Sequence, residues 1–309
     1  MRHNKYRSSF GGLLTVLVTA FVAIGCTKED LSGCDLPEYS LQVKGYDADG
    51  KEVDAETIKD ITLYVFDKDK AFLGLREVAL TESVILDYPG HEVLTVVAWG
   101  NGKQGHQTMP TLKKGDPLET AFVSLIKTRT SLLPEAVSPD DLFYGSTTIE
   151  AIKAPAESAG LSTRANTTAE KVLPVIRKTS SVVVTTRYLR EYVGSTEGEF
   201  RYSLRKSSDK LDFYGKANGM DVSYHPAAAF TPTGDLVSSI FNILPTDIDI
   251  KIDIFHRGVL QTTIISDSQG KPLRAVEGQL LNVFINFKGS INVDVKVTEW
   301  GKKKVWKEF

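Results

Sequence analysis

The side chains of this sequence that could carry out acid–base chemistry are two pairs of aspartates. Asp140 and Asp141 are adjacent, and Asp247 and Asp249 are two positions apart. A glycosidase uses two such carboxyl groups, one as general acid and one as base or nucleophile. No aromatic-rich segment that would line a sugar-binding cleft accompanies either pair, and the three tryptophans are too few to form a stacking platform. We therefore interpret these aspartates as solvated loop residues.

Other catalytic and metal-binding patterns are weak or missing. The sequence has no G-x-S-x-G, no H-E-x-x-H and no P-loop. His225 and His256 are isolated on strand-like segments, which favours hydrogen-bonded structural histidines over metal ligands. The Asp47-Ala-Asp-Gly50 segment resembles part of a calcium loop but lacks its third acid and distal glutamate, so it predicts a turn. We expect neither an enzyme nor a cofactor or metal.

One residue does carry a covalent chemistry, and it lies at the end of an apolar N-terminal segment. Arg2, Lys5 and Arg7 form a basic region, and Leu13–Ile24 is an apolar run too short for a membrane span of about 20 residues. The run ends in Ala23-Ile-Gly-Cys26, which resembles a bacterial lipobox. Cleavage before Cys26 would then leave its thiol to form the thioether to diacylglycerol. The alternative is an ordinary secretory signal with a chance cysteine.

The residues after Cys26 suggest where the lipid would hold the protein. Lys28, Glu29 and Asp30 resemble the surface-export signal of Bacteroidota lipoproteins, and the alternative is a solvated tether. We expect outward-facing placement at the outer membrane. Cys34 would have no intrachain partner, so it is either a buried small hydrophobe, which we favour, or a free reactive thiol.

The composition is that of a folded globular protein. The chain has 309 residues, of which 41% are apolar and 25% charged. Cleavage before Cys26 would remove 25 residues, among them three Lys or Arg and no acids, leaving 284 residues with net charge −5. This acidic balance gives no support to nucleic-acid binding, which needs a basic face.

The elements that must position these residues are short strands. Alternating or β-branched segments separated by Gly, Pro and Asp turns recur along the whole chain, and residues 118–126 alone suggest one short helix. Spacings of 8–12 residues are typical of β-sandwiches. We predict an all-β chain with these divisions: signal peptide 1–25, lipidated tether 26–38, N-terminal sandwich 39–160 and C-terminal sandwich 161–309.

The C-terminal end, Gly301–Phe309, is basic and unusually apolar. Val305, Trp306 and Phe309 are candidates for contact with a partner, or for a strand that docks on its own domain. The alternative is a frayed basic tail. Nine extended residues reach about 30 Å, enough to cover one edge of a sandwich.

Five segments together resemble the fimbrillin-associated anchor proteins of Bacteroidota type V fimbriae (FimB/Mfa type). They are the lipobox at Cys26 with Cys34, Ile61-Thr-Leu-Tyr-Val-Phe-Asp67, Val96-Val-Ala-Trp-Gly-Asn101, Asp141-Leu-Phe-Tyr-Gly145 and Val293-Asp-Val-Lys-Val-Thr-Glu-Trp300. The resemblance implies two tandem transthyretin-like β-sandwich domains, no catalytic residues and no small-molecule substrate. It implies lipidation at Cys26 and structural roles for Trp99 and Trp300.

The resemblance also implies a function: a minor fimbrial subunit that attaches and terminates a fimbrial shaft at the outer membrane, with the shaft subunit as partner. Shaft subunits join by strand donation, in which one subunit's segment fills a groove of its neighbour. An anchor with an N-terminal lipid cannot lose its first strand without being released, so we expect it to keep the strand near residues 40–46. Alternatives are a fimbrial tip adhesin or accessory fimbrillin, and a surface glycan-binding lipoprotein, which should expose aromatic side chains on one sheet face.

Overall fold

The computed structural model describes residues 39–128, 134–150 and 171–299. These residues form strands with very little helix, which confirms the all-β prediction. Within these ranges no helix has the length and apolar character needed to cross a membrane. The signal peptide, the tether, Cys34, Trp300 and the C-terminal tail lie outside the described residues.

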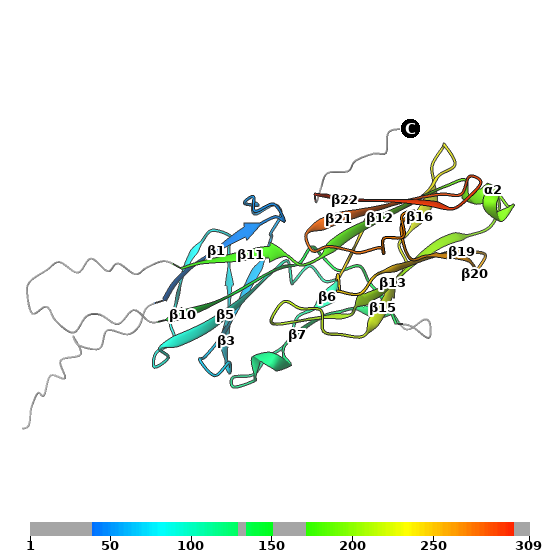
Figure 1. Cartoon of the computed structure of the whole chain (residues 1–309). Coiled ribbons are helices and arrows are strands. Elements are labelled where there is room, and N and C mark those ends of the chain that lie inside the picture. The colour runs from blue at the N-terminus through cyan, green and yellow to red at the C-terminus, as the bar shows by residue number, and fades with distance from the viewer. Residues whose placement is uncertain (1–38, 129–133, 151–170, 300–309) are drawn as a thin grey trace, which may run out of the picture. The chain divides into compact units, whose positions relative to one another are not determined.

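The first sheet has seven strands. Their spatial order is β3 (Phe72–Val78), β2 (Ile61–Phe66), β5 (Val93–Gly100), β10 (Phe143–Glu150), β11 (Lys171–Arg177), β1 (Tyr39–Tyr46) and β4 (Ser83–Leu86). β11 follows residue 161, where the sequence predicts the second domain to begin, but it pairs with β1 and β10. Apolar side chains from β1, β2, β4, β5, β10 and β11 form one buried cluster, so this sheet is curved around its own interior (Figure 1).

Two further sheets pack face to face. One has the order β16 (Ala228–Phe230), β17 (Leu236–Ser238), β12 (Ser180–Arg187), β21 (Gln279–Asn286) and β22 (Asn292–Glu299), with β18 (Phe241–Ile243) also paired to β12. The other has the order β20 (Val259–Ile264), β19 (Lys251–His256), β13 (Phe200–Ser208), β15 (Asp221–Tyr224), β9 (Glu135–Ala136) and β8 (Lys127–Thr128). Their inner side chains share a second buried cluster.

A small fourth sheet contains β14 (Lys210–Asp212), β7 (Phe122–Leu125) and β6 (Gln107–Thr108). The second cluster also contains Trp99, Tyr64 and Phe66 of the first sheet, which meet Phe213 there. The ring centroids of Tyr64 and Phe213 are 4.9 Å apart in an edge-on arrangement. Aromatic contacts therefore join the first sheet to elements of the second half.

Most predicted strands are present within a few residues of their expected bounds, but two segments differ. The helix expected over residues 118–126 is wrong: a single 3-10 turn, Leu118–Thr120, is followed by β7. Val123 pairs with Leu211 of β14, and this tertiary pairing outweighs local helix propensity. The apolar pattern of residues 236–244 predicts one strand, but this segment forms two, β17 and β18, which both pair with β12. The described helix is α2 (Leu189–Val193), a single short turn of chain.

Candidate docking interface

All residues to which the sequence assigns a functional role lie outside the described residues. They are Cys26, Lys28, Glu29, Asp30, Val305, Trp306 and Phe309. The structure does describe the two strands that adjoin them. β1 begins at Tyr39, shortly after the predicted tether, and β22 ends at Glu299, just before the tail.

β1 is held inside the first sheet on both of its edges. It pairs in parallel with β11, with Leu41 opposite Lys171, and antiparallel with β4, with Tyr39 opposite Leu86. Its side chains alternate between buried and half-buried, and Leu41 and Val43 are fully buried. The first strand is therefore retained in the fold of this chain, with its backbone hydrogen bonds made on both sides.

Side chains and a tight turn also hold β1. The Tyr39 hydroxyl donates to the backbone carbonyl of His91, and burial raises the pKa of Tyr39, with a further contribution from Glu92. Gln42 Nε2 donates to the Thr81 carbonyl at 2.9 Å, and the Thr81 amide donates to the Val43 carbonyl at 2.9 Å. Release of this strand would break all of these contacts.

β22 lies at the edge of its sheet. It pairs with β21 on one side, from Asn292 opposite Asn286 to Glu299 opposite Gln279, and no described strand pairs with its other side. Val293 is buried, whereas Val297, on the same face, is 45% exposed. At Val293 this edge is covered by Ser268, whose amide donates to the Val293 carbonyl at 2.8 Å and whose Oγ accepts from the Val293 amide at 2.6 Å. An edge strand of this kind can add an extended segment through its backbone donors and acceptors beyond such a contact.

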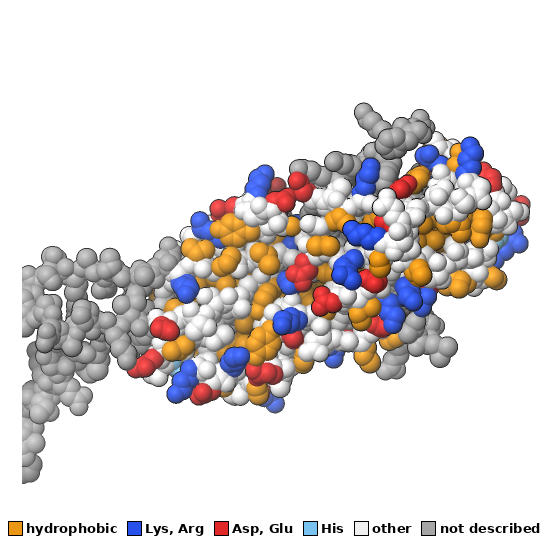
Figure 2. Space-filling view, viewed as in Figure 1, with side chains coloured by type: hydrophobic (Ala, Val, Ile, Leu, Met, Phe, Trp, Pro, Cys, Tyr) orange, Lys and Arg blue, Asp and Glu red, His pale blue; other side chains and the backbone are white. Residues whose placement is uncertain are grey.

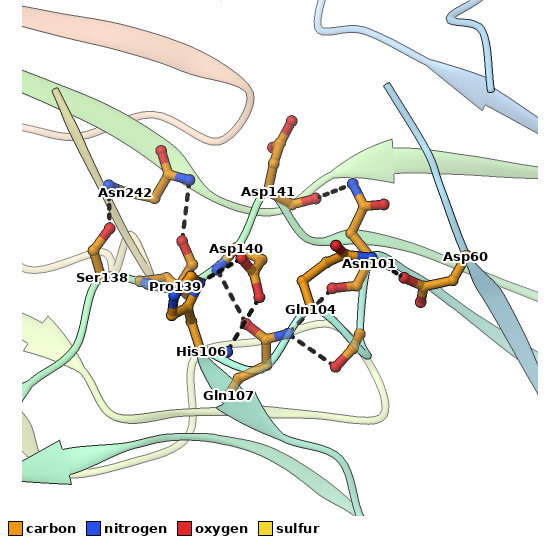
Figure 3. A network of polar contacts seen from close by, with 11 residues as sticks. Asp60, Asn101, Gln104, His106, Gln107, Ser138, Pro139, Asp140, Asp141 and Asn242 are labelled. Atoms are coloured by element: carbon orange, nitrogen blue, oxygen red, sulfur yellow. Dashed lines mark hydrogen bonds and ion pairs between the residues drawn. The ribbon is translucent and has the colours of Figure 1, made fainter. Parts of the chain in front are cut away.

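Asn101, the last residue of the Trp-Gly-Asn motif, joins three loops. Its backbone has φ +58°, in the left-handed region that asparagine tolerates better than most residues. Its Nδ2 donates to the carbonyls of Thr57 and Asp141, both at 2.9 Å, and its Oδ1 accepts from the Lys59 amide at 2.8 Å. Figure 3 shows this amide beside Asp141.

The interpretation of Asp140 and Asp141 as solvated loop residues is wrong, because both side chains are largely buried and hydrogen-bonded. Asp141 accepts from Arg177 Nε at 2.6 Å and from Thr179 Oγ1 at 3.1 Å. Burial raises the pKa of Asp141, and the hydrogen bond from Arg177 offsets part of that rise. Asp140 lies 2.6 Å from His106 Nδ1 and accepts from the His106 amide at 3.2 Å. Both carboxylates are thus engaged by neighbouring side chains, and Asp249 is likewise paired, with Arg274 at 2.8 Å.

The same network reaches the second sheet. The Asn242 amide of β18 donates to Ser138 Oγ at 2.8 Å, and Asn242 Nδ2 donates to the Pro139 carbonyl at 3.1 Å (Figure 3). Gln107 Oε1 accepts from the Asp140 amide at 3.0 Å. Sequence reasoning missed these residues, because single amide side chains on separate elements leave no periodic signal.

The glycine-containing motifs have a packing role. A Cβ added at Gly145 would lie 2.1 Å from the Pro174 carbonyl oxygen, so only glycine lets β10 approach β11 this closely. The segment from Gly100 to Gly105 has the spacing G-x-G-x-x-G, but it leads from β5 to β6 rather than into a helix. It therefore lacks the structural context of a dinucleotide-binding turn.

The landmark tryptophan and the two histidines are structural residues. Trp99 is fully buried, with its ring centroid 5.0 Å from that of Tyr144. His256 Nε2 lies 2.7 Å from the Glu197 carbonyl oxygen, and His225 Nε2 lies 3.0 Å from Ser203 Oγ. The structural interpretation of both histidines is confirmed.

The Asp47 segment is a turn, as predicted. Asp47 Oδ1 accepts from the amides of Asp49 and Lys51, at 3.1 and 2.8 Å. Within the described ranges, no group of three or more His, Cys, Asp or Glu is arranged to hold a metal ion.

The described surface carries no aromatic platform for sugars. Among its large exposed apolar residues the aromatic ones are Tyr192 and Tyr214. Tyr192 packs against Phe287 with centroids 4.4 Å apart, and the Tyr214 hydroxyl donates to Glu119 at 2.6 Å. Lys/Arg and Asp/Glu side chains are interspersed over the face in Figure 2, without a continuous basic surface.

Comparison with known protein families identifies the family to which this chain belongs. The profile of the fimbrillin-A associated anchor proteins Mfa1 and Mfa2 matches residues 31–306. The chain belongs to this family. It is a family of structural anchor proteins, so the expectation that the chain is not an enzyme is confirmed.

Relatives of this anchor family share both sequence and fold with the chain. The major fimbrium anchoring subunit FimB of Porphyromonas gingivalis is 26% identical over 313 aligned positions, which cover 95% of this chain and 96% of FimB. The solved fimbrial anchor protein Mfa2 of P. gingivalis aligns over 85% of this chain and 97% of its own, with TM-score 0.62 and 15% identity. A Bacteroides thetaiotaomicron structure described as polysaccharide-binding aligns over 86% and 99%, with TM-score 0.62 and 16% identity. These two structures establish a shared fold.

Proposed function

We propose that this protein is a lipid-anchored minor fimbrial subunit that attaches and terminates a type V fimbrial shaft at the outer membrane. The observation that carries the proposal is the similarity to FimB, a fimbrium anchoring subunit, over nearly the whole of both chains. The alignment therefore includes nearly all of the structural elements that an anchor would use. The partner is a shaft subunit, and the function needs no cofactor, nucleic acid or small-molecule substrate.

The lipid is attached at Cys26, after cleavage of residues 1–25, and Lys28, Glu29 and Asp30 direct the protein to the outer face of the membrane. The lipobox-like ending of the apolar segment and the charged triplet beside it support this arrangement. The protein would then be surface-exposed and held by its N-terminus.

The body consists of two tandem transthyretin-like sandwich domains, 39–160 and 161–309. The face-to-face sheets of the second half and the shared fold with Mfa2 support two sandwich domains, whereas β11, which follows the boundary, completes the first sheet. Since β1 is paired on both edges, the chain offers no empty strand position there to a donor segment. An anchor of this kind ends the polymer at the membrane, because its own first strand stays with its lipid.

The joint to the shaft uses the C-terminal end, through Val305, Trp306 and Phe309. The opposite terminus is taken by the lipid, and β22, an edge strand among the described residues, leads to the tail. The glycan-binding alternative has no comparable support, since the two exposed aromatic residues of the described surface are engaged elsewhere.

Purification of native fimbriae tests the proposed function. Fimbriae extracted from cells should contain this chain in substoichiometric amount, and deletion of its gene should release fimbriae into the medium while shaft polymerisation continues. Fimbriae that lack the chain and stay on deletion-strain cells would contradict the proposal. A strain that lacks a polysaccharide-uptake lipoprotein serves as the matched control.

A further inference from the structure

A cleft of ≈780 Å³ lies beside the end of the last described strand. Its walls are Lys178, parts of the 215–219 turn, Asp221 and the segments 245–248 and 274–277. None of these residues belongs to the polar network around Asn101, so the cleft is a separate feature of the fold.

Two large apolar side chains line this cleft and face solvent. Ile248 is 55% exposed and Val276 is 40% exposed. A single exposed apolar side chain is ordinary, but a group of them around one concave surface indicates a place where another apolar segment binds.

The cleft also has an acidic group available for a cation. Glu277 is paired with Lys178 at 2.5 Å, and Asp221 is paired with Lys206 at 2.6 Å. Asp247 is exposed and makes no ion pair with another described residue. Lys216 lines the cleft as well, so the attraction for a cation is local to Asp247. A segment that combines apolar side chains with a lysine placed at Asp247 would match this combination of features.

The chain itself supplies such a segment at this position. Glu299, the last residue of β22, lies opposite Gln279 of β21, and the Gln279 amide donates to the carbonyl of Val276 in the cleft wall at 3.2 Å. In Figure 1, β22 runs beside β21. The tail that follows contains Lys302, Lys303, Lys304 and Lys307 among its apolar residues. Nine extended residues reach about 30 Å, which is more than a cleft of this volume requires.

We propose that this cleft is the binding site of the chain's own C-terminal tail, with Val305 and Trp306 against Ile248 and Val276 and a tail lysine toward Asp247. Binding in this cleft shields the apolar side chains of the tail from solvent in the isolated protein. The inference rests on the fold alone. If the shaft also uses these side chains, as proposed above, the shaft and the cleft compete for them.

Limited trypsin digestion of the full-length protein tests whether the tail is bound in the cleft, because trypsin cuts after the tail lysines. The double variant Ile248→Gln/Val276→Gln should lose its C-terminal peptides about tenfold faster than the parent, since cleavage of a docked segment follows its undocked population. The matched control, Leu75→Gln/Val259→Gln, changes two side chains that are 52% and 63% exposed on other strands, and it should be cut at the parental rate.

Trp306→Ala is the complementary variant, because it leaves the cleft intact and weakens the tail. It should accelerate cleavage to a similar degree. Equal rates in the parent, the double cleft variant and Trp306→Ala would overturn the proposal. Protection that disappears when the parent protein is diluted would also overturn it, because a second copy would then be holding the tail.

Discussion

Asn101 donates its side-chain amide to the backbone carbonyl of Asp141 at 2.9 Å, and so joins the Trp-Gly-Asn motif directly to the Asp-Leu-Phe-Tyr-Gly motif. Beside this contact, Gly100 of β5 pairs with Phe143 of β10. Two segments that identify the family are thus one structural unit. Their residues serve the packing of the first sheet.

Asn101→Ala should destabilise the protein strongly. The change removes three hydrogen bonds from a buried site and places alanine at φ +58°. We expect the free energy of unfolding to fall by about 2–4 kcal/mol. Urea denaturation measures this change. Asn101→Gly, which removes the side chain but tolerates the backbone angle, should cost less, and equal losses would show that the backbone conformation contributes nothing.

Gly145→Ala should also destabilise, by about 2–4 kcal/mol, because overpacking against rigid backbone outweighs the lower entropy of the unfolded chain. The new Cβ would meet the Pro174 carbonyl oxygen at 2.1 Å. The matched control is Gly74→Ala in the edge strand β3, where the nearest atom is the mobile hydroxyl end of Tyr88 at 3.1 Å. Thermal unfolding of both variants compares them, and a Gly145 variant as stable as the control would contradict the close approach of β10 and β11.

Arg177→Met should cost about 3–5 kcal/mol near neutral pH, because it leaves the Asp141 carboxylate without its buried counter-ion. Burial already raises the pKa of Asp141, and loss of Arg177 should raise that pKa further. The folded state then binds the proton more tightly than the unfolded state. The penalty is therefore full above the folded-state pKa and shrinks as the pH falls through it toward the unfolded value.

Urea unfolding of the parent and Arg177→Met at pH 8 and pH 5 tests this expectation. The difference in unfolding free energy between the two proteins should be smaller at pH 5. A difference that grows on acidification would mean that Asp141 is not the group left uncompensated. Adding Asp141→Asn to Arg177→Met should restore part of the lost stability.

Cys26→Ala should move the protein from the membrane fraction to the soluble fraction, and fimbriae should be shed from the cells. The reason is that the lipid of the proposed anchor has no other attachment point. Cell fractionation and metabolic labelling with a fatty acid measure both effects. Cys34→Ala is the matched control and should keep the lipid. Continued acyl labelling of the Cys26 variant would end the lipoprotein proposal.

Deletion of residues 301–309 should reduce the number of fimbriae retained on cells while leaving the body folded. Each large apolar side chain of the tail contributes about 1.5–3 kcal/mol when fully buried, and the cost of association offsets part of this. Electron microscopy counts retained fimbriae, and thermal unfolding reports on the body. Unchanged retention would place the joint on another sheet edge, and collapse of the body would assign the tail to the domain core.

The sequence by itself was sufficient for most of the strand content and for the resemblance to the family. Alternation in residues 40–46 and the β-branched and aromatic run 58–66 are local patterns, and they produced the strands 39–46 and 61–66. The structural roles of His225 and His256 followed from their isolation from other ligand-type residues.

Only the tertiary structure decided which strands pair and which side chains meet. The parallel pairing of β11 with β1 joins residues about 130 positions apart, and no local pattern specifies such a partner. Residues 122–125 became a strand because β14 lies beside them. The contacts of Asn101 and Asn242 and the position of the 276–279 turn beside Glu299 likewise depend on long-range packing. The spacing of apolar residues along a strand or helix determines which face is buried. Which other element covers that face depends on the whole fold.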